Sequence, residues 1–167
     1  MLQPHEKSVG KWVNTLNRYS QMYISRNLDK YGVGAGQLHF LMVLYQKDGV
    51  SQQVLTQKLF VDKATAARAI QILEDVGYVV RKPCENDRRI KLVYLTGKAM
   101  KIKKDIIKSL GKWTDILTQN MSEEEKVILT LLLKKSTANA VDYIENDDQD
   151  GFDHENNSLK FNSNSKS

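Results

Sequence analysis

The sequence predicts a mainly α-helical chain that carries one small β-hairpin. Apolar residues recur at three- and four-residue steps over most of the 167 residues, which is the spacing of one helix face. Residues 78–84 and 90–96 depart from this pattern, because both are rich in the β-branched and aromatic residues that strands prefer. The length and the globular composition suit one domain over 1–145 with a short appendage at 146–167.

Two helices are expected at the start of the chain. The first covers about residues 6–29, where the apolar residues follow helical spacing. The stretch YGVGAG at 31–36 interrupts it, because glycines favour a break. The second helix covers about 36–47 and ends before Asp48 and Gly49.

A helix–turn–helix is expected next. Ser51 is a suitable N-cap for a short helix over about 52–59, and Asp62 is a suitable N-cap for a helix over 63–76. Gly77 stands where a helix end favours a left-handed residue. A short helix, a tight turn and a second helix form the arrangement of many DNA readers.

A two-stranded wing follows the second of these helices. The strands 78–84 and 90–96 flank the polar loop ENDRR at 85–89, which indicates a hairpin with a five-residue basic tip. Pro83 cannot donate a ladder hydrogen bond, so its strand is expected at the edge of the sheet. A short strand at Val50 would add a third strand.

Two more helices are expected, over about 97–119 and 123–143. Ser122 and Glu125 form a capping box for the second of them. From 146 to 167 the chain is dominated by Asn, Asp, Ser and Gly and holds five acidic residues and two lysines. We expect this acidic, polar tail to be disordered, because it offers few apolar residues to bury.

The terminal helices predict a homodimer. The helices at about 6–29 and 97–143 carry more apolar surface than the lobe at about 34–96 can cover, and such patches mark interfaces. The residues concerned are Trp12, Leu16, Tyr19, Trp113, Ile116, Leu117, Leu131 and Leu132. Packing of the first helix on the last two within one chain is the alternative. A dimer could place two recognition helices about 34 Å apart, on the half-sites of a pseudo-palindromic operator.

Positive charge is concentrated in one third of the chain. Residues 58–112 hold 14 basic and 6 acidic residues, a net charge of +8, which equals the surplus of the whole segment 1–145. Such a segment favours a polyanion partner, and a solvated lysine-rich helix face is the alternative. No apolar run is long enough to span a membrane and no signal peptide is apparent, so we expect a cytoplasmic protein.

Other function classes find little support in the sequence. No nucleophile–base pair, glycine-rich phosphate loop or cluster of carboxylates with a histidine is apparent, so we expect no enzyme and no cofactor. His5, His39 and His154 are scattered, so we expect no metal site. The single cysteine, Cys84, is either an inert half-buried residue or a thiol sensor activated by nearby basic residues.

The helix at 63–76 has the pattern of a recognition helix. Ala66, Ile70 and Leu73 share one face and should be buried, while Arg68 and Gln71 point to the opposite side. Thr65 on the flank can bond a phosphate, and Arg68 or Gln71 can reach base edges in a major groove. The alternative is a polar surface helix without a ligand.

The loop tip carries two adjacent arginines, Arg88 and Arg89. Asp87 can hold one guanidinium by a forked hydrogen bond, which leaves the other charge for a partner. A basic tip beside a recognition helix fits a narrow minor groove, where negative potential is concentrated. The alternative is a solvent-exposed charged turn.

The run at 61–100 resembles the signature of the MarR family of winged helix-turn-helix regulators. The matching features are Asp62-Lys63-x-Thr65, Arg68, Leu73-Glu74, Gly77, Asp87-Arg88-Arg89 and Leu95-Thr96. The resemblance covers the element order over about 6–143. It implies a winged helix-turn-helix DNA-binding lobe joined to a helical dimerisation region, in which the first, fifth and sixth helices of two chains interlock.

The resemblance also implies roles for single residues. Arg89, positioned by Asp87, would enter the minor groove beside Arg88. Thr65 and Arg68 would serve the major groove. Independently of the resemblance, Lys63 and Gln71 complete the candidate DNA-binding residues of this helix. Two features depart from the family: the second helix begins with Gly34-Ala35-Gly36 rather than a serine or threonine cap, and the first helix lacks the cysteine of the peroxide-sensing branch.

Many members of the family sense small phenolic or lipophilic effectors, or oxidants. The candidates to line an effector cleft here are Trp12, Tyr19, Tyr23, His39 and Met42. The alternative is that these residues belong to the core. The sequence thus predicts a homodimeric, sequence-specific regulator of double-stranded DNA, with repression released by a small aromatic or lipophilic effector. A winged-helix module that binds proteins without specific DNA binding is the second hypothesis.

Overall fold

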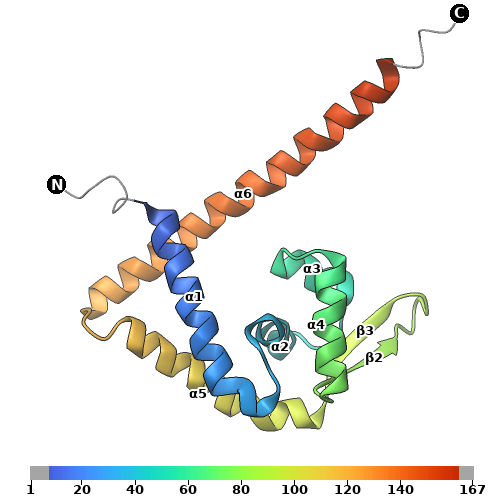
Figure 1. The fold of residues 1–167 in the computed structure, drawn as a ribbon. Coiled ribbons are helices and arrows are strands. Elements are labelled where there is room, and N and C mark those ends of the chain that lie inside the picture. Colours follow the sequence, from blue (N-terminus) through green and yellow to red (C-terminus); the bar gives the residue numbers. More distant parts are fainter. Residues whose placement is uncertain (1–7, 162–167) are drawn as a thin grey trace, which may run out of the picture. The chain divides into compact units, whose positions relative to one another are not determined.

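The computed structural model describes residues 8–161, and the side chains of residues 8–144. It divides into two units, residues 1–117 and 118–167, which are considered separately. The first unit contains α1 (Val9–Leu28), the 3₁₀ turn η2 (Asp29–Tyr31), α2 (Ala35–Gln46), β1 (Val50–Ser51), α3 (Gln52–Leu59), α4 (Lys63–Asp75), β2 (Val79–Pro83), β3 (Lys91–Leu95) and α5 (Gly97–Leu117) (Figure 1). The second unit contains α6 (Glu123–Phe161). The predicted mainly helical fold with a small β wing is confirmed.

Capping side chains confirm the helix starts that the sequence indicates. The hydroxyl of Ser51 accepts a hydrogen bond from the backbone amide of Val54 at 3.3 Å, and so caps α3. Ser122 and Glu125 form the predicted reciprocal capping box at the start of α6. Gly77, just after α4, has a φ of +81°, as expected for a left-handed residue at a helix end.

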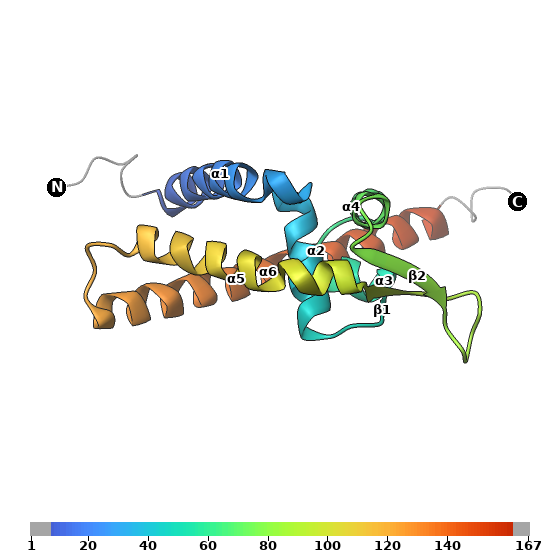
Figure 2. The ribbon, with the colours of Figure 1, turned by 90° about the horizontal axis from the view of Figure 1, so that it is seen from below.

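The sheet has three antiparallel strands in the order β1-β3-β2. In the register of β2 and β3, Val79 lies opposite Leu95 and Pro83 lies opposite Lys91. Because β3 is central, Pro83 stands on an edge strand as predicted. The strand at Val50 is also present, and Val50 pairs with Val93. The hairpin extends beyond α2, α3 and α4 as a wing (Figure 2).

One hydrophobic core holds α2, α3, α4 and the sheet together. Its fully buried side chains include Leu38, Leu41, Leu44, Leu55, Ala66, Ile70, Leu73, Val79 and Val93. The predicted buried face of α4 is therefore confirmed. Burial of a leucine or valine side chain contributes about 1.5–3 kcal/mol, so this core fixes the orientation of α4 and of the wing.

The C-terminal half of α1 packs on α5 (Figure 2). The rings of Tyr23 and Trp113 stack with their centroids 4.7 Å apart. The indole Nε1 of Trp113 donates to the hydroxyl of Ser20 at 3.0 Å. Trp113 thus packs within the chain, which matches the intrachain alternative for this residue.

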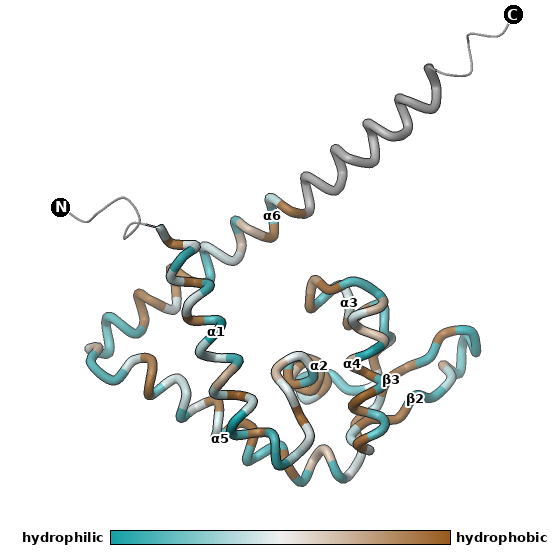
Figure 3. Tube along the Cα trace, in the orientation of Figure 1, coloured by the Kyte–Doolittle hydropathy of each residue, from teal (hydrophilic) through white to brown (hydrophobic). Residues whose placement is uncertain are grey.

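Large apolar side chains remain exposed on both units of the single chain. In the first unit they include Val9, Trp12, Val13, Leu16 and Tyr19 of α1 and Ile107, Ile116 and Leu117 of α5. In the second unit they include Val127, Ile128, Leu131, Leu132 and Leu133 of α6. Figure 3 shows hydrophobic residues recurring along these helices.

The ends of the last helices differ from the expectation. Helix α5 ends at Leu117 rather than near 119, and α6 continues to Phe161 rather than ending near 143. No proline interrupts residues 144–161, so nothing blocks continued backbone hydrogen bonding despite weak helix formers such as Asn and Asp. The disorder expected for the tail at 146–167 stays a prediction, and residues 162–167 lie outside the described part.

Candidate nucleic-acid interface

The start of α4 is organised by Asp62. One carboxylate oxygen accepts from the backbone amide of Thr65 at 2.8 Å, and the other accepts from the Thr65 hydroxyl at 2.6 Å. These bonds from Thr65 hold the pKa of Asp62 below its ordinary value. The predicted cap is confirmed, and it fixes the Thr65 side chain at the first turn of the helix.

Two cations project beside this turn. Lys63 and Arg68 are exposed, and Arg68 Nη2 lies 3.4 Å from the Thr65 hydroxyl oxygen. Lys63, Thr65 and Arg68 thus form a polar, cationic surface at the amino end of α4. The small exposed side chain of Ala64 lies between them and leaves space for close approach of a ligand.

Gln71 of α4 is engaged in hydrogen bonds with two other side chains. Its amide nitrogen donates to Asp75 at 2.8 Å, and its amide oxygen accepts from Arg81 at 2.9 Å. Both polar ends of the side chain therefore already have partners. A base contact by Gln71 would require it to exchange these bonds.

Arg81 of β2 is the residue that the sequence analysis missed. Its guanidinium forms an ion pair with the carboxylate of Glu74, and its backbone amide donates to the same carboxylate at 3.2 Å. Its Nη2 also lies 3.5 Å from the Ala67 carbonyl oxygen. Arg81 therefore connects the wing to Glu74, Gln71 and Ala67 of α4. Its side chain is half-buried and faces the protein.

The wing tip has the predicted forked contact. Asp87 accepts from Arg89 at Nε (3.1 Å) and at Nη2 (3.3 Å), as well as from its backbone amide at 3.0 Å. These bonds from Arg89 lower the pKa of Asp87. The Arg89 side chain is nonetheless 92% exposed, so its orientation is fixed while its charge faces solvent. Arg88 is also exposed.

A pocket of about 370 Å³ lies beside α4. It is lined by Gly36, Gln37, His39, Phe40, Leu59, Val61, Thr65, Arg68, Ala69 and Ile72. Most of the lining is apolar, while Thr65 and Arg68 are shared with the cationic surface of α4. Partial burial lowers the pKa of His39 below its ordinary value of 6.5, which favours the neutral imidazole near pH 7.

The structure does not bring the five predicted effector residues together. His39 lines the pocket beside α4, whereas Tyr23 lines a different one between α1 and α5. Met42 packs against the core. Trp12 and Tyr19 are about half exposed on α1 of the single chain, at 52% and 51%. The five residues therefore lie in different surroundings in the single chain, and their role toward an effector stays a prediction.

Other predicted features concern metals, membranes and the cysteine. Within the described residues no three His, Cys, Asp or Glu side chains gather to hold a metal ion, and no helix is long and apolar enough to cross a membrane. His5 and the side chain of His154 lie outside the described residues. Cys84 is half-buried, and its amide closes the wing loop by donating to the Ile90 carbonyl at 2.8 Å.

Comparisons with known proteins agree with this geometry. A family model described as MarR family matches residues 31–90. The HTH-type transcriptional regulator BilQ of Clostridium symbiosum is 31% identical over 68% of this chain and 79% of its own length. A solved MarR transcriptional regulator from Methanosarcina mazei Go1 is 41% identical, with a TM-score of 0.76 over 80% of this chain and 96% of its own.

A second solved structure includes a nucleic acid. The MarR family regulator from Listeria monocytogenes, complexed with a 26mer DNA, is 26% identical, with a TM-score of 0.76 over 81% of this chain and 91% of its own. The similarity in fold includes the lobe of this chain that carries the cationic surface of α4 and the wing. The chain therefore belongs to the MarR family of transcriptional regulators, and it is a DNA-binding regulator with a winged helix-turn-helix.

Proposed function

We propose that the protein is a homodimeric repressor that binds a pseudo-palindromic operator through α4 and the wing. In this arrangement Lys63, Thr65 and Arg68 contact the major groove, and Arg89 enters the adjacent minor groove beside Arg88. The observation that carries this proposal is the fixed but exposed Arg89, which Asp87 holds in a forked contact at the tip of the wing. A preordered cation loses little conformational entropy on binding a narrow, negative groove.

Dimerisation is supported by the exposed apolar residues. In the single chain, Val9 is 67% exposed and Leu131 is 58% exposed, on α1 and α6 respectively. Covering about 1,000 Å² of such surface would contribute on the order of 25 kcal/mol before entropy costs. Two chains would also supply the two reading helices that a two-fold symmetric operator requires.

A small aromatic or lipophilic effector would act through the pocket beside α4. The apolar side chains of Phe40, Leu59 and Ile72 offer contacts to such a molecule, and Arg68 stands on the rim. A bound effector would change the position of Arg68 or the space around it, and so lower the affinity for DNA. We further propose a cytoplasmic location, where the operator is accessible.

Fluorescence anisotropy with duplexes from the neighbouring genomic region tests the proposal. Binding should weaken steeply with salt, by about 0.9 log unit in affinity per log unit of salt for each phosphate neutralised. Arg89→Ala should weaken binding to all duplexes, and Arg68→Ala should also relax the base preference. If both variants bound DNA like the parent, the groove assignment would be wrong.

Two further measurements separate the alternatives. Sedimentation at micromolar concentration should show a dimer, and a monomer would contradict the dimeric arrangement. A winged-helix module that binds only proteins would show no preference among duplexes at any salt concentration. Titration of the DNA complex with neutral phenols should release the duplex if the pocket beside α4 is the effector site.

A further inference from the structure

A second pocket lies between α1, η2 and α5. It has a volume of about 240 Å³ and is lined by Tyr23, Asn27, Leu28, Lys30, Tyr31, Asp105, Lys108, Ser109 and Lys112. All of these residues belong to the first unit of the chain. No residue of the proposed DNA surface or of the effector pocket contributes to it.

The charge of this pocket is strongly unbalanced. Three lysines, Lys30, Lys108 and Lys112, line it together with one carboxylate, Asp105. Among the described residues no carboxylate lies within ion-pair distance of any of the three ammonium groups. The pocket therefore has a formal charge of +2 in a small recess.

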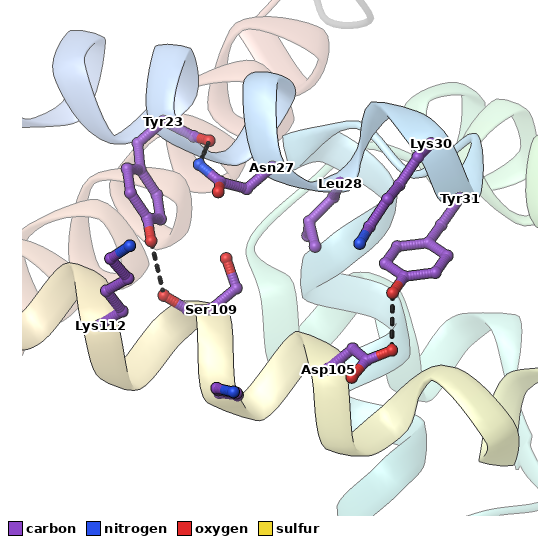
Figure 4. A pocket seen from close by; sticks show the side chains of 9 residues that line it. Tyr23, Asn27, Leu28, Lys30, Tyr31, Asp105, Ser109 and Lys112 are labelled. Carbon is purple, nitrogen blue, oxygen red and sulfur yellow. Dashed lines mark hydrogen bonds between the residues drawn. The ribbon is translucent and has the colours of Figure 1, made fainter.

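The single carboxylate is already engaged. The Tyr31 hydroxyl donates a hydrogen bond to Asp105 at 2.6 Å, which fixes that side chain at the floor between η2 and α5 (Figure 4). The Tyr23 hydroxyl donates to the Ser109 carbonyl at 3.2 Å at the other end of the pocket. These two bonds connect the two walls of the recess.

The lysines approach the recess from both walls. Lys108 and Lys112 are four residues apart on α5 and so share one helix face, where like charges destabilise a helix. Lys30 comes from the opposite wall, beside Tyr31, and its Nζ lies 4.8 Å from the centroid of that ring (Figure 4). An anion between the walls would relieve the repulsion among all three.

We infer that this pocket binds a small, doubly charged anion of the phosphate monoester class. Lysine ammonium groups bind phosphate as point charges and need no fixed fork geometry. The recess is smaller than the pockets of about 300–1,000 Å³ that hold drug-sized ligands, so a small ligand fits it best. The site is distinct from the effector pocket beside α4, which is apolar.

The test is calorimetric titration of the full chain with phenyl phosphate, at about pH 7.5, where this probe carries two charges. Lys108→Gln/Lys112→Gln should weaken binding by roughly tenfold or more. The matched control is Lys101→Gln/Lys104→Gln, which removes the same charge from exposed positions of α5 that do not line the pocket. The control should bind phenyl phosphate as the parent does, and any binding of neutral phenol should be equal in the parent and in both double variants.

Three results would overturn the inference: no binding of phenyl phosphate to the parent, equal weakening in both double variants, or a loss of phenol binding in Lys108→Gln/Lys112→Gln that matches its loss of phenyl phosphate binding. Thermal unfolding of each variant shows whether it is folded, because bound phosphate ester should raise the midpoint of the parent and of the control only.

A DNA titration on the same samples separates a free phosphate ester from a phosphate of the duplex backbone. Equal DNA affinity of the two double variants supports the small ligand. A loss of DNA affinity confined to Lys108→Gln/Lys112→Gln, without phenyl phosphate binding to the parent, assigns the lysines to DNA and overturns the proposal. The calorimetric result requires no DNA, so it stands independently of the proposed operator binding.

Discussion

Arg81 of β2 and Glu74 of α4 form an ion pair that joins the wing to the recognition helix. The two residues stand on either side of the Gly77 turn, so the contact closes the corner between the elements. The guanidinium also donates to Gln71 at 2.9 Å, which extends the link one turn along α4. The two surfaces that would enter adjacent grooves are thus held at a fixed angle by a residue that faces the protein.

Arg81→Met is therefore expected to weaken DNA binding without removing a DNA contact. Hydrogen bonds to charged groups contribute about 1.5–3 kcal/mol, so a loss of stability in this range is expected in urea unfolding. A double-mutant cycle with Glu74→Gln should give a coupling energy of about 0.5–3 kcal/mol. Lys91→Met removes the same charge from an exposed wing position and is the control. A coupling energy near zero would contradict the structural link.

Asp87→Asn tests whether the orientation of Arg89 or the net charge of the wing determines DNA affinity, because the two effects have opposite signs. The substitution removes one negative charge and so raises the net charge by one, and by long-range electrostatics alone it should strengthen DNA binding. We expect the opposite, a loss of roughly tenfold in affinity, because Arg89 loses its ionised forked acceptor. Glu85→Gln makes the same charge change in the same loop and should leave the affinity equal or slightly higher. Similar affinities for the two variants would show that orientation of Arg89 is unimportant.

His39 predicts a pH dependence of stability. Because burial lowers its pKa in the folded state below the ordinary 6.5, the unfolded chain binds more protons at mildly acidic pH. The stability linked to the neutral imidazole is therefore complete above about pH 6.5 and is lost as the pH falls through the folded pKa. As the pH is lowered from about 7.5 to 5, the urea midpoint of the parent should fall more steeply than that of His39→Gln. Parallel profiles would exclude this residue as the cause.

Local signals in the sequence were sufficient to predict where the helices and strands of the DNA-binding lobe begin and end, to within about two residues. Capping residues such as Asp62 act within one turn, so their effect is readable without tertiary structure, and the forked contact of Asp87 with Arg89 spans only two residues. The role of Arg81 was harder to predict, because the alternation of polar and apolar residues in a strand indicates which side chains are exposed but not which residues they contact. A negative and a positive residue flanking Gly77 were the available signal.

The positions of the candidate effector residues could not be predicted from local signals, because they depend on how the helices pack. Tyr23 and His39 both lie on helices that the sequence predicts, but these helices present them to different pockets. Which faces of α1, α2 and α5 meet depends on core packing, such as the stack of Tyr23 on Trp113. The end of α6 was also missed, because the loss of an apolar stripe after residue 143 indicates loss of a packing face and not the end of backbone hydrogen bonding.

Phe60 gives the last prediction, since it is a non-glycine residue with a left-handed backbone (φ +51°) at the end of α3. This conformation costs an L-residue about 1–2 kcal/mol, whereas glycine adopts it freely. The side chain is 61% exposed, so its removal sacrifices little burial. Because the greater freedom of glycine in the unfolded chain offsets about 0.5–1 kcal/mol, Phe60→Gly should stabilise the protein by roughly 0.5–1 kcal/mol.

Urea unfolding checks this expectation against Lys58→Gly, which places a glycine two residues earlier, at an exposed position inside α3. That control should lower stability by about 1 kcal/mol, because glycine is a poor helix former. The opposite signs of the two substitutions would locate the strain in the backbone of Phe60. If Phe60→Gly also lowered the midpoint, the Phe60 side chain would have to make contacts, within a dimer, that outweigh the backbone strain.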